Sequence, residues 1–348
     1  MDKQLLAELE ETLKEVIKIP APPGFEEPLA QQVSKEIKSL GLKPERDNLG
    51  NAYTRIDGGG PVLLITAHMD ETALLIHHVD EMGRLRFKTL GGLKPMMLYS
   101  QHVIVHTSKE EVPGIIPAIP PHLGKGDEKQ ISIEELYIDV GLESKDEAQD
   151  LGINPPLPAT LKPTLSGLRK GEILVGRPLD NRVSVAALLT LARRLVNIEA
   201  KTSTLILAWT VQEEVGIRGA RALASRIQPD YMLALDVMTY SSPPATGGYK
   251  PGGGPVLRIY DRSMISCKKL DRLILDTASQ NGITVQRGVG VGGTDAAAGW
   301  MEGACSSGIM TPSQYTHSTV EKIYKRDWFL QTKLTLLTAT RFLRENTV

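Results

Sequence analysis

The chain has 348 residues, of which 41% are hydrophobic and 23% charged, and its formal net charge is -1. This is an ordinary globular composition, and the length allows two domains or one large domain with an insertion. The lysines and arginines form no long run, which argues against nucleic acid as the main partner because phosphate binding needs a concentrated positive face.

The opening segment MDKQLLAELEETLKEV predicts an amphipathic helix and lacks the apolar core of a signal peptide. No apolar run approaches the roughly 20 residues of a membrane span, so we expect no membrane partner. Cys267 and Cys305 cannot build a disulfide framework, which favours a reducing compartment. These features together predict a cytoplasmic protein.

The N-terminal part of the chain alternates helices with strands. Apolar residues at helical spacing predict a first helix that ends at the proline-rich stretch 19–23, and a second helix follows over 27–40. Strands are predicted over 51–56 and 62–66. The second strand is a continuous apolar run, typical of a strand buried on both faces, and it leads into the polar sequence AHMDE (67–71). Ligands of open α/β sheets bind at the carboxyl ends of strands, so these polar groups are candidates for a site.

Between residues 72 and 163 the chain changes character. Short β-rich pieces alternate with glycine and proline, and no helical pattern appears before about residues 144–151. We interpret 72–163 as a small β-rich domain inserted into an α/β domain made of 1–71 and 164–348. Its polar stretch 124–132 predicts a mobile loop.

After residue 176 the α/β alternation resumes and continues to the end of the chain. Helices are predicted over 183–196, 218–227, 268–280, 295–301 and 320–344. Strands are predicted over 204–211, 231–237, 256–260 and 284–288. Such alternation predicts a mostly parallel or mixed sheet with helices on both faces.

Two of the seven histidines stand out by their neighbours. His68 follows an apolar strand and precedes Asp70 by two residues. An imidazole can bind a metal through one nitrogen while a carboxylate holds the other N–H. His317 lies in QYTHS, just before the last predicted helix. A histidine on a strand or in a loop usually just finds a hydrogen bond, and we expect a structural role for the other five: His77, His78, His102, His106 and His122.

Four acidic residues also follow predicted strands. Asp180 lies in GRPLDNR before a helix, where it could instead be a simple helix cap. Glu213 and Glu214 follow the apolar strand LILAWTV; they could be a solvated pair, or one could bind metal while the other moves protons. Asp236 ends the strand YMLALD, where an acid is costly unless it is paired or bound to metal.

Together these residues suit a pair of metal ions. Two metals about 3.5–4 Å apart need one bridging carboxylate and a few terminal ligands. Carboxylate and imidazole donors suit zinc, cobalt or manganese, and the absence of cysteine disfavours a purely structural zinc site. The candidate ligands are His68, Asp180, Glu214, Asp236 and His317.

At this point the sequence resembles a known family, the tetrahedral aminopeptidases. These are dinuclear metallopeptidases that include glutamyl and deblocking aminopeptidases. The matching segments keep the family's order and span nearly the full chain. They are PPGFEEP (22–28), AHMDE (67–71), PPHL (120–123), GRPLDNR (176–182), VQEEVGIRGA (211–220), LDV (235–237), GGTDA (292–296) and YTHSTVE (315–321).

The resemblance implies a mixed-sheet metallopeptidase of the phosphorylase/hydrolase-like fold that removes N-terminal residues from peptides. His68 would hold one of two divalent ions, zinc or cobalt, with Asp70 behind it. Asp180 would bridge both ions, and Glu213 would be the general base that takes a proton from the water between them. Glu214, Asp236 and His317 would complete the ligand set. The resemblance also implies a dimerisation role for the β-rich insert and assembly of dimers into a hollow dodecamer.

The chain departs from the family at two points. The family usually has Ile-Gly where this chain has Thr72 and Ala73, and an arginine commonly stands where this chain has Gln314. Neither change removes a candidate metal ligand, so we expect them to affect substrate preference.

Other functions remain alternatives. A dinuclear N-acyl amino acid deacylase or carboxypeptidase could use nearly the same ligands. A metal-binding or shell-forming subunit without catalysis is disfavoured by the presence of Glu213. The glycine runs lack the spacing of phosphate loops. A glycoside hydrolase would use a carboxylate pair but would have no use for His68 and His317.

Overall fold

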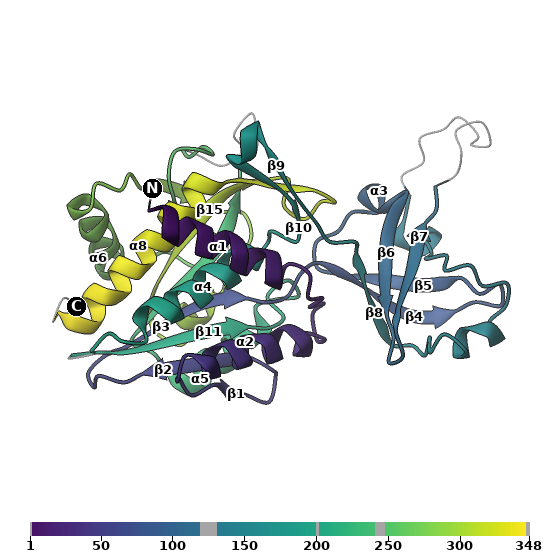
Figure 1. Ribbon diagram of the computed structural model, residues 1–348, viewed down its shortest axis with the longest axis horizontal. Coiled ribbons are helices and arrows are strands. Elements are labelled where there is room, and N and C mark those ends of the chain that lie inside the picture. Colours follow the sequence, from purple (N-terminus) through teal and green to yellow (C-terminus); the bar gives the residue numbers. More distant parts are fainter. Residues whose placement is uncertain (1, 119–130, 200–201, 241–247, 346–348) are drawn as a thin grey trace. The chain divides into compact units, whose positions relative to one another are not determined.

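The computed structural model describes residues 2–118, 131–199, 202–240 and 248–345, and it divides into two compact units (Figure 1). The first unit consists of Met1–Asp70, Leu165–Thr316 and Val320–Val348. The second consists of Glu71–Thr164 and the short segment His317–Thr319. The first unit has a mixed sheet and the second an antiparallel one. The predicted fold class, a mixed α/β fold with an inserted β-rich part, is confirmed.

In the part of the chain that the structure describes, eleven strands form the sheet of the first unit, in the order β1-β2-β11-β3-β12-β15-β16-β10-β9, with β13 beside β15 and β14 beside β13. The centre is parallel: β11 pairs with β3, β3 with β12, and β12 with β15. The strands are β1 (Glu45–Arg46), β2 (Ala52–Ile56), β3 (Val62–His68), β9 (Thr164–Leu168), β10 (Ile173–Arg177), β11 (Thr204–Thr210), β12 (Tyr231–Thr239), β13 (Val256–Tyr260), β14 (Gln286–Val289), β15 (Cys305–Gln314) and β16 (Glu321–Tyr324).

The parallel centre explains where polar groups gather. β3 and β11 are almost completely buried, as their continuous apolar runs predict. Their register pairs His68 with Thr210, so both strands end at the same level of the sheet. The loops that follow them therefore leave the same edge.

Helices cover this sheet, and α4 is the most deeply buried of them. Two tryptophans donate hydrogen bonds from their indole N–H groups to backbone carbonyls of α4. Trp209 of β11 donates to the Val185 carbonyl, and Trp328 of α8 (Lys325–Arg344) donates to the Val183 carbonyl. Figure 1 shows α1 beside α4. The helices are α1 (Lys3–Val16), α2 (Glu27–Ser39), α4 (Arg182–Leu195), α5 (Arg218–Ile227), α6 (Lys268–Gln280), α7 (Ala296–Met301) and α8 (Lys325–Arg344).

The second unit has its own sheet and its own core. Its strands follow the antiparallel order β5-β4-β8-β6-β7, and alternate side chains such as Val103 and Val105 are buried. The predicted helical turn near 144–151 is only a short 3₁₀ helix, Asp146–Gln149. The predicted loop 124–132 lies mostly outside the described residues, as does His122. The elements are β4 (Ala73–Val79), β5 (Leu85–Leu90), α3 (Pro95–Leu98), β6 (Gln101–His106), β7 (Glu111–Ile116) and β8 (Leu157–Leu161).

Near the C-terminus one prediction is wrong and one strand was missed. The stretch Glu321–Tyr324, predicted as the start of the last helix, is strand β16, because Glu321 and Ile323 are buried against β10 and alternate with half-buried neighbours. The ten-residue strand β15 was not predicted at all. Its sequence CSSGIMTPSQ is rich in residues that disfavour strands, and burial between neighbouring strands overrides that preference.

The structure also joins the two cysteines. Cys267, which caps α6, and Cys305, the first residue of β15, form a disulfide with their Cα atoms 5.2 Å apart. This bond contradicts the expectation that the two cysteines favour a reducing compartment, because residues 38 positions apart in sequence meet only in the fold. No described helix combines the length and the apolar character needed to cross a bilayer.

Candidate metal centre

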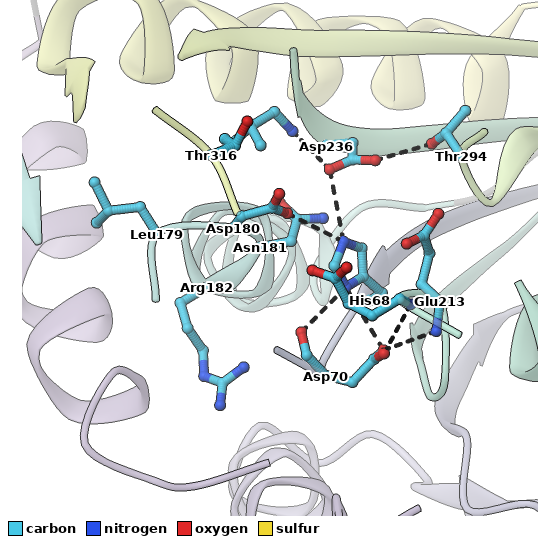
Figure 2. Close-up of polar contacts among 12 residues, drawn as sticks. His68, Asp70, Leu179, Asp180, Asn181, Arg182, Glu213, Asp236, Thr294 and Thr316 are labelled. Carbon is cyan, nitrogen blue, oxygen red and sulfur yellow. Dashed lines mark hydrogen bonds and ion pairs between the residues drawn. The ribbon is translucent and has the colours of Figure 1, made fainter. Parts of the chain in front are cut away.

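The predicted site residues of the first unit come from four separate segments. His68 is the last residue of β3, and Asp236 lies on β12. Asp180 lies in the turn between β10 and α4, and Glu213 and Glu214 lie in the loop that follows β11. Figure 2 shows that the side chains of His68, Asp180 and Asp236 point toward one another.

Three of these side chains form a compact buried group. The Nε2 atom of His68 lies 3.3 Å from Oδ1 of Asp180 and 3.6 Å from Oδ1 of Asp236. All three residues are buried, and each offers one ligand atom within 4.8 Å of the others. One imidazole and two carboxylates are donors that zinc, cobalt or manganese accept, so the group fits a divalent metal ion.

Asp180 also approaches a second carboxylate. A carboxylate oxygen of Glu214 lies within 4.8 Å of a carboxylate oxygen of Asp180. Asp180 therefore belongs both to the His68 group and to a pair with Glu214. This is the position that a bridging carboxylate between two metals would occupy.

His317 belongs to the second unit, as the first residue of the short segment His317–Thr319. Its ring lies against Gly92, where an added Cβ would come within 2.6 Å of Nδ1 of His317. Its backbone is left-handed, with φ of 59°. Within the first unit the structure thus brings together four of the five predicted ligands, and the part played by His317 stays a prediction.

Asp70 links His68 to the loop of the two glutamates. Nδ1 of His68 lies 3.2 Å from the Asp70 carbonyl oxygen and 3.6 Å from its Oδ1 atom. The same carboxylate accepts hydrogen bonds from the backbone N–H groups of Glu213 and Glu214, each at 2.9 Å. Asp70 is fully buried, so it fixes the ring on one side and the glutamate loop on the other.

The electrostatics of the centre favour a bound cation. Burial raises the pKa values of Glu213 and Glu214 well above the usual range, and neighbouring carboxylates add to the effect. Burial alone would lower the pKa of His68, but its contacts with Asp180, Asp236 and Asp70 hold that pKa well above its usual value. So many acidic groups in a buried site are stabilised when positive charge joins them.

Arg182 is the buried arginine drawn beside the centre in Figure 2. Its Nε atom donates to the Val16 carbonyl at 3.1 Å and one terminal nitrogen to the Ile19 carbonyl at 2.9 Å. The other terminal nitrogen donates to the Met69 carbonyl. These contacts hold α4 against the N-terminal segment and against the residue that follows His68.

Three supporting residues were not singled out from the sequence. Glu321 accepts hydrogen bonds from the backbone N–H groups of Leu179 and Asp180, at 2.6 and 2.9 Å. Asn181 donates to the Leu235 carbonyl at 2.9 Å, and Thr294 donates to Oδ2 of Asp236 at 3.1 Å. All three lie in the matching segments GRPLDNR, GGTDA and YTHSTVE, and those segments were the signal that could have identified them.

Glu321 is a buried acid with one cationic neighbour. Its pKa is raised to about 7, first by burial and also by the charge of Asp180, and the nearby Arg177 guanidinium opposes this rise. The Glu321 carboxylate accepts hydrogen bonds from the turn that carries Asp180, and these bonds fix the backbone of this candidate bridging residue.

Comparison with known proteins identifies the class of enzyme that this chain resembles. Residues 50–334 match the family described as M42 glutamyl aminopeptidase. A glutamyl aminopeptidase of Lactococcus lactis subsp. cremoris is 31% identical over 337 residues, which cover 93% of this chain and 93% of that protein. A lysyl aminopeptidase of Pyrococcus furiosus is 29% identical over 327 residues and covers 91% of this chain and 92% of its own.

Solved structures agree with this similarity. The TET1 peptidase of Pyrococcus horikoshii, described as able to assemble into a tetrahedron or a large octahedral shell, matches with a TM-score of 0.89 and 38% identity. The match covers 95% of this chain and 99% of that one. A TET aminopeptidase from a marine sediment archaeon, Thaumarchaeota archaeon SCGC AB-539-E09, also gives 0.89, at 29% identity and 98% coverage of both chains.

Proposed function

The chain belongs to the M42 glutamyl aminopeptidase family and is a metal-dependent aminopeptidase, and from this premise we propose that its buried acidic centre binds two divalent metal ions. The observation that carries the proposal is the convergence of His68, Asp180 and Asp236 within 4.8 Å at the edge of a parallel sheet. The proposed ligands are His68, Asp180, Asp236, Glu214 and His317.

In this proposal each metal has its own terminal ligands and the two share Asp180. His68 and Asp236 hold one ion, and Glu214 holds the other. His317 completes the second set. Support comes from the position of Asp180, whose carboxylate lies near both His68 and Glu214. The ions would polarise the scissile carbonyl and lower the pKa of a water molecule.

We further propose Glu213 as the group that moves protons. It stands beside the ligand Glu214, and its backbone N–H is fixed by Asp70. Burial raises its pKa, so its carboxylate can take a proton from water and afterwards give it to the leaving amine. One residue then serves first as base and then as acid.

We expect a preference for neutral N-terminal residues. The sequence motifs of the site include no obvious additional lysine or arginine that would bind an acidic side chain of a substrate. The described hydrogen bonds of Arg182 go to backbone carbonyls. The relatives named above are a glutamyl and a lysyl aminopeptidase, so the family's names alone do not decide the preference.

The decisive test is hydrolysis of a panel of aminoacyl p-nitroanilides and short peptides. The protein is assayed after chelation and again after addition of zinc or cobalt, the two ions that we propose. Release of the N-terminal residue from unblocked peptides, restored by metal, is the expected result. Cleavage of acylated amino acids with unblocked peptides left intact would contradict it and would favour the deacylase alternative.

We propose that the protein is a homo-oligomer in which dimers assemble into a dodecamer. The support is the similarity to peptidases described as tetrahedral, octahedral or dodecameric assemblies. We assign dimerisation to the β-rich insert. Light scattering should show a large particle for the full chain and smaller assemblies after deletion of residues 73–163. A large particle that survives the deletion would contradict this role.

We also propose a cytoplasmic location. The resemblance to a family of cytosolic metallopeptidases supports it, whereas the Cys267–Cys305 disulfide stands against it because such bonds are rare in most cytosolic proteins. Fractionation of source cells, with the two thiols trapped by alkylation before lysis, tests both points. Recovery of the enzyme outside the cytosolic fraction would contradict the proposal.

A further inference from the structure

The loop after β11 contains both the proposed general base and one proposed metal ligand. Glu213 and Glu214 follow Val211 and Gln212 directly, and all four are outside the regular strand. Gln212 has left-handed backbone, with φ of 56°. Because these residues lie outside the strand pairing of β11, other contacts must hold their backbone in position.

The backbone N–H groups of these four consecutive residues all donate to side chains. Asp70 accepts from Glu213 and from Glu214, one hydrogen bond to each of its carboxylate oxygens. The remaining two N–H groups, of Val211 and Gln212, are bound by side chains from two further segments. The loop is thus held through its main chain and its glutamate side chains remain available to the centre.

Glu26 binds the second of these four groups. Its Oε1 atom accepts from the Gln212 backbone N–H at 3.0 Å, and only 4% of the residue is exposed. It stands directly before α2, far from Gln212 in sequence. Burial and then the charge of Asp70 raise its pKa to about 7, while backbone hydrogen bonds from Gly24, Glu26 and Gln212 lower it. Burying the Glu26 carboxylate near that of Asp70 costs free energy unless hydrogen bonds compensate for it. The backbone N–H of Gln212, which is distant in sequence, provides one such hydrogen bond.

Asn51 binds the first group and closes the other end of the loop. Its Oδ1 atom accepts from the Val211 N–H, and its Nδ2 atom donates to the Gly219 carbonyl, both at 2.9 Å. A Cβ at Gly219 would lie 2.5 Å from Oδ1 of Asn51, so glycine is required there. Asn51 is also held by Asp47, which accepts from Nδ2 at 2.6 Å.

We infer that Glu26 is a positioning residue for catalysis, which acts by holding the Gln212 amide and thereby the side chains of Glu213 and Glu214. This inference rests on the proposed roles of those two glutamates. Glu26 does not itself belong to the metal ligands or touch the reacting atoms. Glu26 supplies a hydrogen-bond acceptor for the Gln212 N–H. A buried N–H without an acceptor costs free energy, so without Glu26 this part of the loop would shift from its present position.

Three variants and one control test this role in the full-length protein. Glu26→Ala removes the acceptor, Glu26→Asp keeps the charge but shortens the side chain, and Glu26→Gln keeps both the length and an acceptor oxygen. Glu27→Gln is the control, because Glu27 is the adjacent residue and its carboxylate is exposed and paired with Arg46.

The first measurement is hydrogen–deuterium exchange at single-residue resolution over 211–214, which does not depend on any catalytic role. We expect the Gln212 amide to exchange at least about tenfold faster in Glu26→Ala and Glu26→Asp. In Glu26→Gln and in the Glu27→Gln control, exchange should remain as in the unmodified protein. If Glu26→Ala does not fold, the comparison of Glu26→Asp with Glu26→Gln carries the same information.

The second measurement is steady-state kinetics with saturating metal, together with metal titration of the chelated protein. A displaced base costs turnover more than substrate binding, so kcat should fall about tenfold to a hundredfold in Glu26→Ala and Glu26→Asp with KM little changed. Glu26→Gln should restore kcat to within about threefold. The metal dissociation constant should rise in the same two variants because Glu214 shares the loop.

Unchanged exchange at Gln212 in Glu26→Ala would overturn the inference, as would equal loss of kcat in Glu26→Ala and Glu26→Gln. Failure of the proposed function gives a different result. If Glu213→Gln remained active, the roles of the glutamates would be wrong, and faster exchange at Gln212 would still show that Glu26 holds the loop.

Discussion

Both units of the chain place histidines on strands, and the two settings differ in a way that separates function from structure. In the first unit His68 ends a parallel strand, is 3% exposed, and lies within 4 Å of three carboxylates. In the second unit His77, His78 and His102 are exposed on antiparallel strands. Histidine is therefore buried among carboxylates in the first unit and exposed to solvent in the second.

His106 is the intermediate case. It is half-buried, its Nε2 atom lies 2.9 Å from Oγ1 of Thr160, and its Nδ1 atom lies 3.6 Å from the exposed Glu111. Burial lowers its pKa, in contrast to His68, whose pKa the surrounding acids raise. Convergence of acids from several strand ends, more than burial of a histidine by itself, distinguishes the proposed metal centre. Four substitutions test this contrast.

The largest effect should come from Asp180→Ala. Because this carboxylate lies beside both His68 and Glu214, its loss should abolish binding of both metals and bring turnover to the background of the assay. Metal content by mass spectrometry and activity on a peptide substrate are measured together. Asp57→Ala, an exposed surface acid paired with Arg55, is the control and should retain both. A fully loaded, active Asp180→Ala protein would refute the bridging role.

Glu213→Gln should be the next most severe change. The amide keeps the size of the side chain but cannot accept a proton, so kcat should fall about a hundredfold to ten-thousandfold. Metal content should stay at two ions for each chain, which distinguishes this variant from Asp180→Ala. Turnover close to that of the unmodified protein would show that another group is the base.

Thr294→Val should have a moderate effect. Valine keeps the shape of threonine but removes the hydroxyl that donates to Oδ2 of Asp236, so metal affinity should weaken about tenfold. Competition with a chromogenic chelator measures the affinity. Thr338→Val on α8 is the matched control because its buried hydroxyl has no hydrogen-bond partner among the residues that the structure describes. Equal affinities in the two variants would exclude Thr294 as a support of the centre.

His102→Gln should have the smallest effect. The residue is exposed on β6 of the second unit, so metal content and kcat should stay within about twofold of the unmodified protein. The same titration and assay apply. A loss of one metal would contradict the view that the second unit's strand histidines are structural.

The sequence predicted the parts of the fold that local pattern determines. The apolar runs before AHMDE and VQEE predicted β3 and β11, and helical periodicity predicted α5 and α6 with their observed bounds. It could not predict β15, because its serines, glycine and proline become a strand only through pairing with β12 and β13. The disulfide likewise depends on the approach of α6 to that strand.

The grouping of the candidate residues was predictable to a similar extent. Polar residues at or near the ends of strands selected His68, Asp180 and Asp236 as candidates, and the fold brings these three together, while their binding of metal stays a prediction. The contacts of Glu26 and Glu321 were not predictable, because both act on backbone N–H groups that are distant in sequence. Only the three-dimensional path of the loops makes those partners visible.

The most direct test of this account is anomalous X-ray diffraction from crystals of the full chain loaded with zinc or cobalt, measured at the absorption edge of the metal. The account predicts two peaks in the first unit, one among His68, Asp180 and Asp236 and one beside Asp180 and Glu214. A single peak, or peaks at the strand histidines of the second unit, would contradict a shared two-metal centre at the edge of the parallel sheet.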